Sequence, residues 1–395
     1  MKKRTRFIIL IICVLAFFIF TPILVAYSIG YRFDFEKMRI TSTGGIYVRT
    51  YPAPEQVIID SKIIEKPGIF SSATFTQSLL PANHTILAQK AGYYDYFKTI
   101  PVLEKEVTKL ENIILFKKNI EFEMVENTVE SPFADNERFV LKNSNLYYSN
   151  ILKNVGISEA QKLIPVIKKI SAFSIQNNNI IWLGTDGFLY KSNLSDLSAE
   201  PIKLVLNPIK ILKTGTYKII TDNNNIFVND NGSLLTLNSQ TNELEDFYSP
   251  ATDIKISPDG KNIIYYNENN IYVSPLPIIL TVESNLLYAT PAKITNIVWL
   301  NNNYIIFADE NNIIISEIDY RGNINTVTLP QAVIVTKIPT SDAQKSATTT
   351  QVSSVSEPQE IEINIKNPQI YFDQQTNKLY ILTGENLLLS EKIIP

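Results

Sequence analysis

The chain has 395 residues, with 39 acidic and 36 basic side chains, which gives a formal net charge of −3 at pH 7. This acidic balance argues against nucleic acid as a partner, because nucleic-acid-binding proteins present a basic face. Hydrophobic residues make up 45% of the chain, so large cores can be buried, and the length favours two domains in addition to a membrane anchor.

The first predicted element is a transmembrane helix. Residues 7–31 carry no charged side chain and consist largely of Phe, Ile, Leu, Val and Ala. A helix that crosses the hydrocarbon core of a bilayer needs about 20 predominantly apolar residues, and this run is long enough. We therefore predict a transmembrane helix over residues 7–29.

The charges that flank this run predict its orientation. Residues 1–6 contain four basic side chains, and such flanks stay in the cytoplasm. We expect residues 1–6 to be the cytoplasmic tail of a single-pass cell-membrane protein whose remaining domains are extracytoplasmic. A cleaved signal peptide is the alternative, but its apolar core would span about 7–15 residues and end at a small-residue site, which residues 25–28 resemble poorly.

Residues 30–42 are predicted to be a short connector. Aromatic residues concentrate there and at the end of the apolar run, including Tyr31, Phe33 and Phe35. Such residues are typical of the aromatic belt at a membrane–water interface.

Residues 43–118 contain short strand patterns bounded by Pro and Gly. The predicted strands are Ile46–Thr50, Gln56–Asp60, Ala73–Leu79, His84–Gln89, Tyr94–Pro101 and Val107–Phe116. This spacing is typical of a small antiparallel β-sandwich.

Four motifs follow one another in this segment. They are Thr43-Gly-Gly-Ile-Tyr-Val-Arg-Thr-Tyr-Pro52, Val57-Ile-Ile-Asp60, Leu80-Pro81-Ala82-Asn83-His84-Thr85-Ile86 and Lys90-Ala91-Gly92-Tyr93. In order and spacing they resemble the PEGA domain family. The resemblance implies a small sandwich that acts as a stalk or as a wall-proximal adhesive unit.

Residues 119–395 repeat a pattern of strand, Asn-rich turn, strand, turn and strand. Units begin near residues 172, 209, 253 and 294, and a spacing of about 40 residues is the period of a propeller blade. We count about six units and predict a β-propeller, in which the strand Ile120–Val125 pairs with the last blade. The turn Ser257-Pro-Asp-Gly-Lys261 resembles that of TolB-type and WD-like propeller repeats.

Two composition features interrupt this repeat. Asn runs such as 177–179, 223–225 and 301–303 are interpreted as turn chemistry, because Asn tolerates left-handed backbone. Residues 341–359 are rich in Ser, Thr and Gln and hold few large apolar side chains. We predict that they form a disordered insertion, because they cannot bury enough surface to offset the entropy of ordering.

The sequence identifies no catalytic, cofactor-binding or metal-binding residue, and we expect no cofactor. The only histidine, His84, is interpreted as a hairpin residue, and the only cysteine, Cys13, lies in the apolar run. A zinc site generally needs several His or Cys ligands, and a catalytic triad needs a histidine beside its nucleophile. No phosphate-binding loop or dinucleotide fingerprint occurs.

Carboxylate chemistry remains open. Glycosidases need only two acids at a suitable separation. The candidate acids of the repeated region are Asp186, Asp222, Asp230, Asp253, Asp259 and Asp309. Sialidase propellers clamp their anionic sugar with three arginines, whereas this region holds only Arg138 and Arg321. Calcium could bind among the Asp–Asn loops, but these have no recognised loop spacing.

The prediction for function is a non-enzymatic, membrane-anchored cell-envelope protein. Its PEGA-like module would be a stalk or adhesive unit, and its propeller would be a scaffold that binds a protein or a polysaccharide, because propeller loops are held on a rigid frame. An exported polysaccharide hydrolase with acids in the propeller funnel is the alternative. An inward-signalling sensor is less favoured, because a tail of six residues is too short for a signalling domain.

Overall fold

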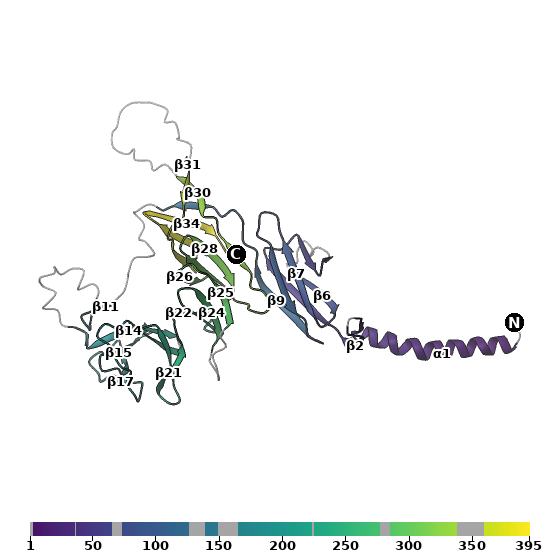
Figure 1. The fold of residues 1–395 in the computed structure, drawn as a ribbon, viewed down its shortest axis with the longest axis horizontal. Helices are drawn as coiled ribbons and strands as arrows, with labels where there is room; N and C mark the ends of the chain where they lie inside the picture. The colour runs from purple at the N-terminus through teal and green to yellow at the C-terminus, as the bar shows by residue number, and fades with distance from the viewer. Residues whose placement is uncertain are drawn as a thin grey trace, which may run out of the picture.

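The computed structural model describes residues 3–35, 37–64, 73–125, 139–148, 165–222, 225–276, 285–337 and 359–395. Strands make up 56% and helix 7% of the structure, so the prediction of a mainly β protein with one N-terminal apolar helix is confirmed. Figure 1 shows that helix projecting from one end of an elongated set of small sheets.

The helix α1 spans Lys3–Ser28. Its segment Arg6–Ser28 is long and apolar enough to cross a membrane, and none of its most apolar window is buried inside the protein, unlike the core helix of a soluble domain. Two short antiparallel strands follow it directly, β1 (Tyr31–Asp34) and β2 (Arg39–Ser42). The connector predicted for residues 30–42 is therefore largely a hairpin.

Two sheets that share one hydrophobic core follow, and we name them the first body. The strand orders are β6-β3-β9 and β5-β4-β7-β8. The bounds are β3 Gly44–Tyr51, β4 Gln56–Ile59, β5 Lys62–Ile64, β6 Ala73–Leu79, β7 Asn83–Gln89, β8 Tyr96–Pro101 and β9 Val107–Ile114. Each of the six predicted strands is present, and β5 is additional. The expectation of a purely antiparallel arrangement is wrong, because β3 and β9 pair in parallel.

The remaining strands form the second body. A three-stranded sheet contains β11 Phe139–Lys142, β12 Asn145–Tyr148 and β13 Ile167–Lys168. Two four-stranded sheets follow, with β14 Ile170–Gln176, β15 Asn179–Gly184, β16 Leu189–Asn193 and β17 Ile202–Lys203, then β18 Tyr217–Asp222, β19 Asn225–Asp230, β20 Ser233–Asn238 and β21 Glu243–Tyr248. Neighbouring strands within these sheets pair antiparallel.

Three further sheets complete the second body. Two are four-stranded, with β22 Asp253–Ile256, β23 Asn262–Tyr266, β24 Asn270–Pro275 and β25 Asn285–Ala289, then β26 Ile294–Trp299, β27 Tyr304–Asp309, β28 Asn312–Glu317 and β29 Thr326–Thr328. The last has the order β31-β30-β10-β34-β33-β32, with β10 Phe122–Met124, β30 Ala332–Lys337, β31 Gln359–Asn364, β32 Gln369–Asp373, β33 Lys378–Thr383 and β34 Asn386–Lys392.

Each sheet of the second body shares a hydrophobic core with the next one along the chain. Each four-stranded sheet buries one face against its predecessor and the other against its successor, which accounts for nearly continuous apolar strands such as β27. Among the described residues, the first and last sheets share no such core.

Several predictions for the repeated region can be compared with these sheets. Sheets begin at Ile170, Asp253 and Ile294, close to the predicted starts, but the start at residue 209 is wrong, because the strand begins at Tyr217. The segment before Tyr217 is not part of a strand. Its residues Ile209 and Ile211 pack against the hydrophobic core that the sheets β14–β17 and β18–β21 share. The predicted pairing of the strand near residue 120 is confirmed, because β10 pairs with β34, the last strand.

The turn predictions and the insertion have different outcomes. Asn177 adopts a positive φ of 52°, and Asn301 accepts hydrogen bonds from the backbone of residues 303 and 304, so both serve turns as predicted. The predicted insertion 341–359 lies outside the described residues, except that Gln359 begins β31.

Candidate functional site

The candidate site lies where the first body meets the sheet β26–β29, and we name this region the junction (Figure 1). Along β8, alternate side chains face inward, and Tyr96, Lys98 and Ile100 share one side. Tyr96 and Ile100 belong to the core of the first body, whereas Lys98 is fully buried with an exposed fraction of 0%. A buried ammonium group is costly unless it is paired.

Lys98 is paired across the junction. Its Nζ donates to Glu317 Oε1 at 2.5 Å and to the backbone carbonyl of Asp319 at 2.7 Å, and it lies 3.8 Å from Asp319 Oδ2. The Glu317 carboxylate also accepts from Tyr96 Oη at 2.9 Å and from the backbone N–H of Asn325 at 2.9 Å. Each oxygen of this buried carboxylate therefore has at least one donor.

The pKa values of the two acids of the junction, Glu317 and Asp319, are shifted in opposite directions. Burial raises the pKa of the Glu317 carboxyl, and Lys98 offsets part of this effect. Burial alone would also raise the pKa of Asp319, but the hydrogen bonds and charge of Arg321, with the charge of Lys98, hold it below its usual value. The same burial, with the charge of Glu317 beside it, raises the pKa of Tyr96.

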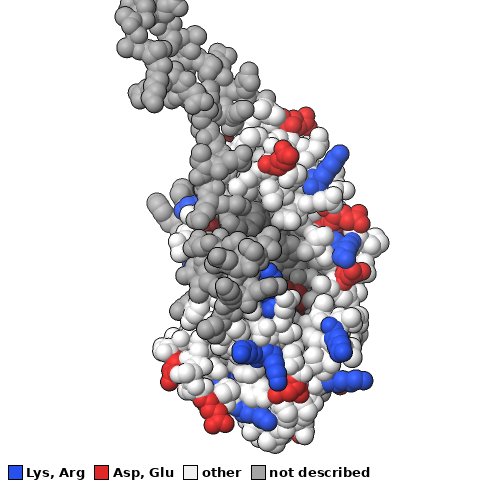
Figure 2. Space-filling model, turned by 90° about the vertical axis from the view of Figure 1, so that its left-hand side faces the viewer, with Lys and Arg blue, Asp and Glu red and all other residues white. Residues whose placement is uncertain are grey.

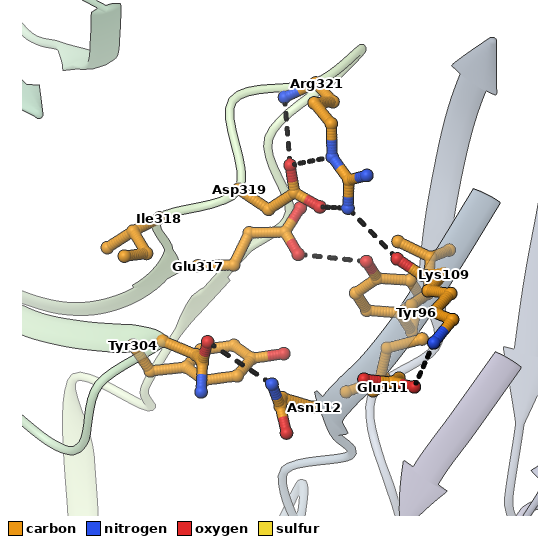
Figure 3. A pocket seen from close by; sticks show the side chains of 12 residues that line it. Tyr96, Lys109, Glu111, Asn112, Tyr304, Glu317, Ile318, Asp319 and Arg321 are labelled. Atoms are coloured by element: carbon orange, nitrogen blue, oxygen red, sulfur yellow. Dashed lines mark hydrogen bonds and ion pairs between the residues drawn. The ribbon is translucent and has the colours of Figure 1, made fainter. Parts of the chain in front are cut away.

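Arg321 ties the loop after β28 to the first body. Its Nε and Nη2 donate to the two oxygens of Asp319 at 2.9 and 2.8 Å, a bidentate arrangement, and Nη2 also donates to the Lys109 carbonyl of β9 at 3.1 Å. Figure 3 shows Arg321 and Asp319 on the loop and Tyr96 and Lys109 on the first body, facing one another.

The next two residues of this loop meet the free edge of β8. Asn323 donates from Nδ2 to the Phe97 carbonyl at 2.9 Å and accepts from the Thr99 N–H at 2.6 Å, so it pairs with β8 as a neighbouring strand would. Gly322 has a φ of +70°, and a Cβ there would lie 1.7 Å from the Thr99 carbonyl oxygen. Only glycine fits this approach.

Apolar contacts extend the junction beyond the charged groups. Ile114 and Phe116 belong to the core shared by the last two sheets of the second body. Tyr304 Oη accepts from the Ile114 N–H at 3.1 Å, and its ring packs edge-on against Phe116 with centroids 5.4 Å apart. The two bodies are therefore joined by a continuous core as well as by ion pairs.

A cavity of about 260 Å³ opens beside these groups. Its lining includes Tyr96, Lys109, Glu111, Asn112, Glu317 and Arg321 (Figure 3). Two carboxyls with oppositely shifted pKa values are a recognised arrangement for acid–base chemistry. Here, however, Glu317 is ion-paired with Lys98, and Asp319 is ion-paired with Arg321. In the conformation described, the cluster therefore connects the two bodies.

A larger groove of about 720 Å³ lies between turns of the sheets β18–β21 and β22–β25, and we name it the turn groove. Its lining includes Thr216, Tyr217, Asn231, Thr252, Glu268 and Asn269. Amide, hydroxyl and carboxylate groups of this kind suit hydrogen bonding to a polar ligand.

The sequence-predicted candidate acids are dispersed. Asp186 accepts from Tyr190, Asp253 pairs with Lys218 and Asp309 accepts from Asn312. Asp230 accepts from Asn231, Asp259 accepts from Ser257 within its turn, and Asp222 ends β18. Among the described residues, no group of three or more His, Cys, Asp or Glu side chains is placed to hold a metal ion.

His84 lies in β7, and both of its ring nitrogens face oxygens. Nδ1 contacts Asp60 Oδ2, and Nε2 lies 2.7 Å from the Leu80 carbonyl. The ring thereby ties the turn between β4 and β5, which holds Asp60, to the turn that precedes β7. Of the two arginines considered for an anionic sugar, Arg321 lies at the junction and Arg138 lies outside the described residues.

Sequence reasoning missed Lys98, Glu317, Asp319 and Tyr96. One signal was present: the predicted strand Tyr94–Pro101 alternates, which places Lys98 between Tyr96 and Ile100 on the inward side. Its partner could not be found in this way, because Glu317 is 219 residues away in sequence.

Comparisons with known proteins assign no family. Neither the models of known protein families nor the curated proteins give a match. Among solved structures, the computationally designed Ika8 protein has a TM-score of 0.37 at 10% identity over 78% of this chain and 93% of its own. The designed Ika4 protein has a TM-score of 0.27 at 14% identity over 41% and 91%, respectively.

Proposed function

We propose that this protein is a non-enzymatic, membrane-anchored scaffold of the cell envelope. In this proposal α1 spans the cell membrane with its N-terminus in the cytoplasm. The first body is a PEGA-like stalk, and the second body is a propeller-like scaffold of about six blades that holds a protein or polysaccharide partner.

The observation that carries the proposal is the buried Lys98–Glu317 pair at the junction. A buried pair of this kind favours one arrangement of the two bodies, because a closed junction in which one partner was displaced would leave the other charge buried and unpaired. A scaffold benefits from such a junction, since a rigid stalk holds the binding surface at a fixed distance and orientation. The series of similar sheets that share cores supports the propeller-like interpretation of the second body.

The net charge of −3, with the mixed charge on one face, supports a partner other than nucleic acid. On the described residues of the face shown in Figure 2, Lys and Arg side chains are interspersed with Asp and Glu. Nucleic-acid-binding proteins instead gather positive charge on one face.

The binding role can be tested with the turn groove. Full-length protein in lipid nanodiscs would be immobilised and exposed to separate protein and polysaccharide fractions of the envelope. We expect Glu268→Ala together with Asn269→Ala to reduce retention of one fraction. The control Glu385→Ala, in the exposed turn between β33 and β34, should retain as much as the wild type. Equal retention by all three proteins would contradict a binding role for this groove.

The alternative is an exported polysaccharide hydrolase, and the junction favours it in one respect. Glu317 and Asp319 line one cavity, and their pKa values are shifted in opposite directions. Glu317→Gln removes the acid, so a loss of reducing-end release from envelope polysaccharide in this variant, with folding retained, would favour the hydrolase. No such release by the wild-type protein would favour the scaffold.

A further inference from the structure

The β1–β2 hairpin has two chemically different faces. In its register Phe33 lies opposite Ile40, and Arg32 lies opposite Thr41. Residues directly opposite each other in an antiparallel pair share a face, and neighbours along a strand alternate. Phe33 and Ile40 therefore share one face, and Arg32 and Thr41 share the other.

Three polar side chains of the hairpin, those of Asp34, Thr41 and Ser42, are buried against the protein. Asp34 and Thr41 are buried, with exposed fractions of 4% and 3%. Thr41 Oγ1 donates to Glu104 Oε1 at 2.7 Å, and Ser42 Oγ donates to Glu104 Oε2 at 3.0 Å. These bonds fasten the hairpin to the loop between β8 and β9.

The apolar side chains of the hairpin turn outward. Exposed fractions are 42% for Phe33, 79% for Phe35, 73% for Met38 and 70% for Ile40. The rings of Phe33 and Phe35 pack together with centroids 5.0 Å apart. A hairpin on a soluble surface would show the reverse pattern, with apolar residues inward, and clustered exposed apolar groups mark an interaction surface.

The hairpin is also held against the end of α1. Arg32 Nη1 donates to the Tyr27 carbonyl in the last turn of the helix at 2.7 Å, and its guanidinium lies 3.4 Å from the centre of the Tyr27 ring. Thr43 Oγ1 donates to the Gly30 carbonyl at 2.8 Å. Figure 1 shows β2 at the point where the helix meets the first body.

We propose that the outward face of this hairpin, formed by Phe33, Phe35, Met38 and Ile40, lies in the lipid interface of the membrane that α1 crosses. The occupant of this face is lipid, because the face continues directly from the apolar helix and the Arg32 contacts hold it there. Lys37 and Arg39 lie on the same hairpin and pair with Asp34 at 4.0 Å and Glu104 at 3.6 Å, but about half of each side chain is exposed, which leaves room for contact with lipid phosphates. This contact of the hairpin with the membrane then sets the angle of the first body to the membrane. This inference depends on the proposed membrane anchor.

The test uses full-length protein reconstituted into phosphatidylcholine vesicles with bromine on the upper part of the acyl chains. Bromine quenches nearby tryptophan. Phe35→Trp and Ile40→Trp should lose emission in brominated relative to unbrominated vesicles. Leu206→Trp is the matched control, because it is similarly exposed at 66% and lies in the second body. The wild type, with only Trp182 and Trp299, gives the background.

Quenching at residues 35 and 40 above that of the control would support the inference. Equal quenching at residues 35, 40 and 206 would overturn it, and a blue-shifted emission without quenching would show that protein covers this face. Flotation of the same vesicles after an alkaline wash measures the anchor separately. A chain that floats with the vesicles but is not quenched refutes only the membrane contact of the hairpin. A chain that does not float refutes the membrane anchor.

Discussion

The Nζ atom of Lys98 lies 2.5 Å from Glu317 Oε1, although the two residues belong to different bodies of the protein. Both side chains are almost completely buried, with exposed fractions of 0% and 5%. This pair is the centre of the junction, and three of the four predictions below concern groups around it.

Lys98→Met should destabilise the junction by about 3–5 kcal/mol, because it leaves the Glu317 carboxylate buried without its counter-charge. The measurement is urea unfolding in detergent, followed by tryptophan fluorescence, to which Trp299 in β26 and Trp182 in β15 both contribute. The double variant Lys98→Met, Glu317→Met removes both charges and should be less destabilised than Lys98→Met alone. If the double variant lost as much free energy of unfolding as Lys98→Met and Glu317→Met lose in sum, the two charges would not be coupled.

Gly322→Ala should destabilise the protein more than Gly92→Ala. Both glycines have positive φ, 70° and 80°, so alanine costs roughly 1–2 kcal/mol of backbone strain at either position. At Gly322 the new Cβ would also meet the Thr99 carbonyl oxygen, whereas at Gly92 nothing lies within 4 Å. Equal losses of stability for the two variants, measured by thermal unfolding, would show that the loop after β28 can move away from β8 without a cost in free energy.

Tyr304→Phe should cost about 1–3 kcal/mol, because the buried Ile114 N–H loses its acceptor. Tyr47→Phe on β3 is the control for loss of a tyrosine hydroxyl, and no hydrogen bond of this hydroxyl to another described residue is seen. The same unfolding measurement compares the two variants. A similar stability of both would mean that water replaces the Tyr304 hydroxyl.

The stability of the first body should fall at acid pH through Asp60. Partial burial would raise the pKa of this carboxyl, but hydrogen bonds from His84 and Thr85 outweigh burial and hold the pKa below its usual 3.8. The unfolded chain therefore binds a proton at higher pH than the folded chain. The contribution of Asp60 is fully present above its unfolded pKa and is lost as the pH falls through its folded pKa.

Asp60→Asn removes this titration. Thermal unfolding measured between about pH 3 and pH 7 should then show a smaller loss of stability at the acid end than in the wild type. A variant with an unchanged acid profile would show that other carboxyls account for the loss.

Local patterns in the sequence were sufficient for most of the elements. The apolar run predicted α1, and alternating residues between Pro, Gly and Asn predicted six of the seven strands of the first body, all except β5, because strand and turn preferences act within a few residues. The error at residue 209 has a local cause too. Ile209 and Ile211 are apolar because they pack against a core, and an apolar pattern alone does not distinguish packing from pairing.

Only the tertiary structure decided how these elements combine. The sequence could place Lys98 on the inward side of a strand, but the folded chain supplied Glu317, Asp319 and Arg321 from more than 200 residues away. It also paired β3 with β9 in parallel and placed β10 between β30 and β34. Hydrophobic periodicity reports which face of a strand is buried, whereas the partner of that face depends on long-range packing that no short segment of sequence records.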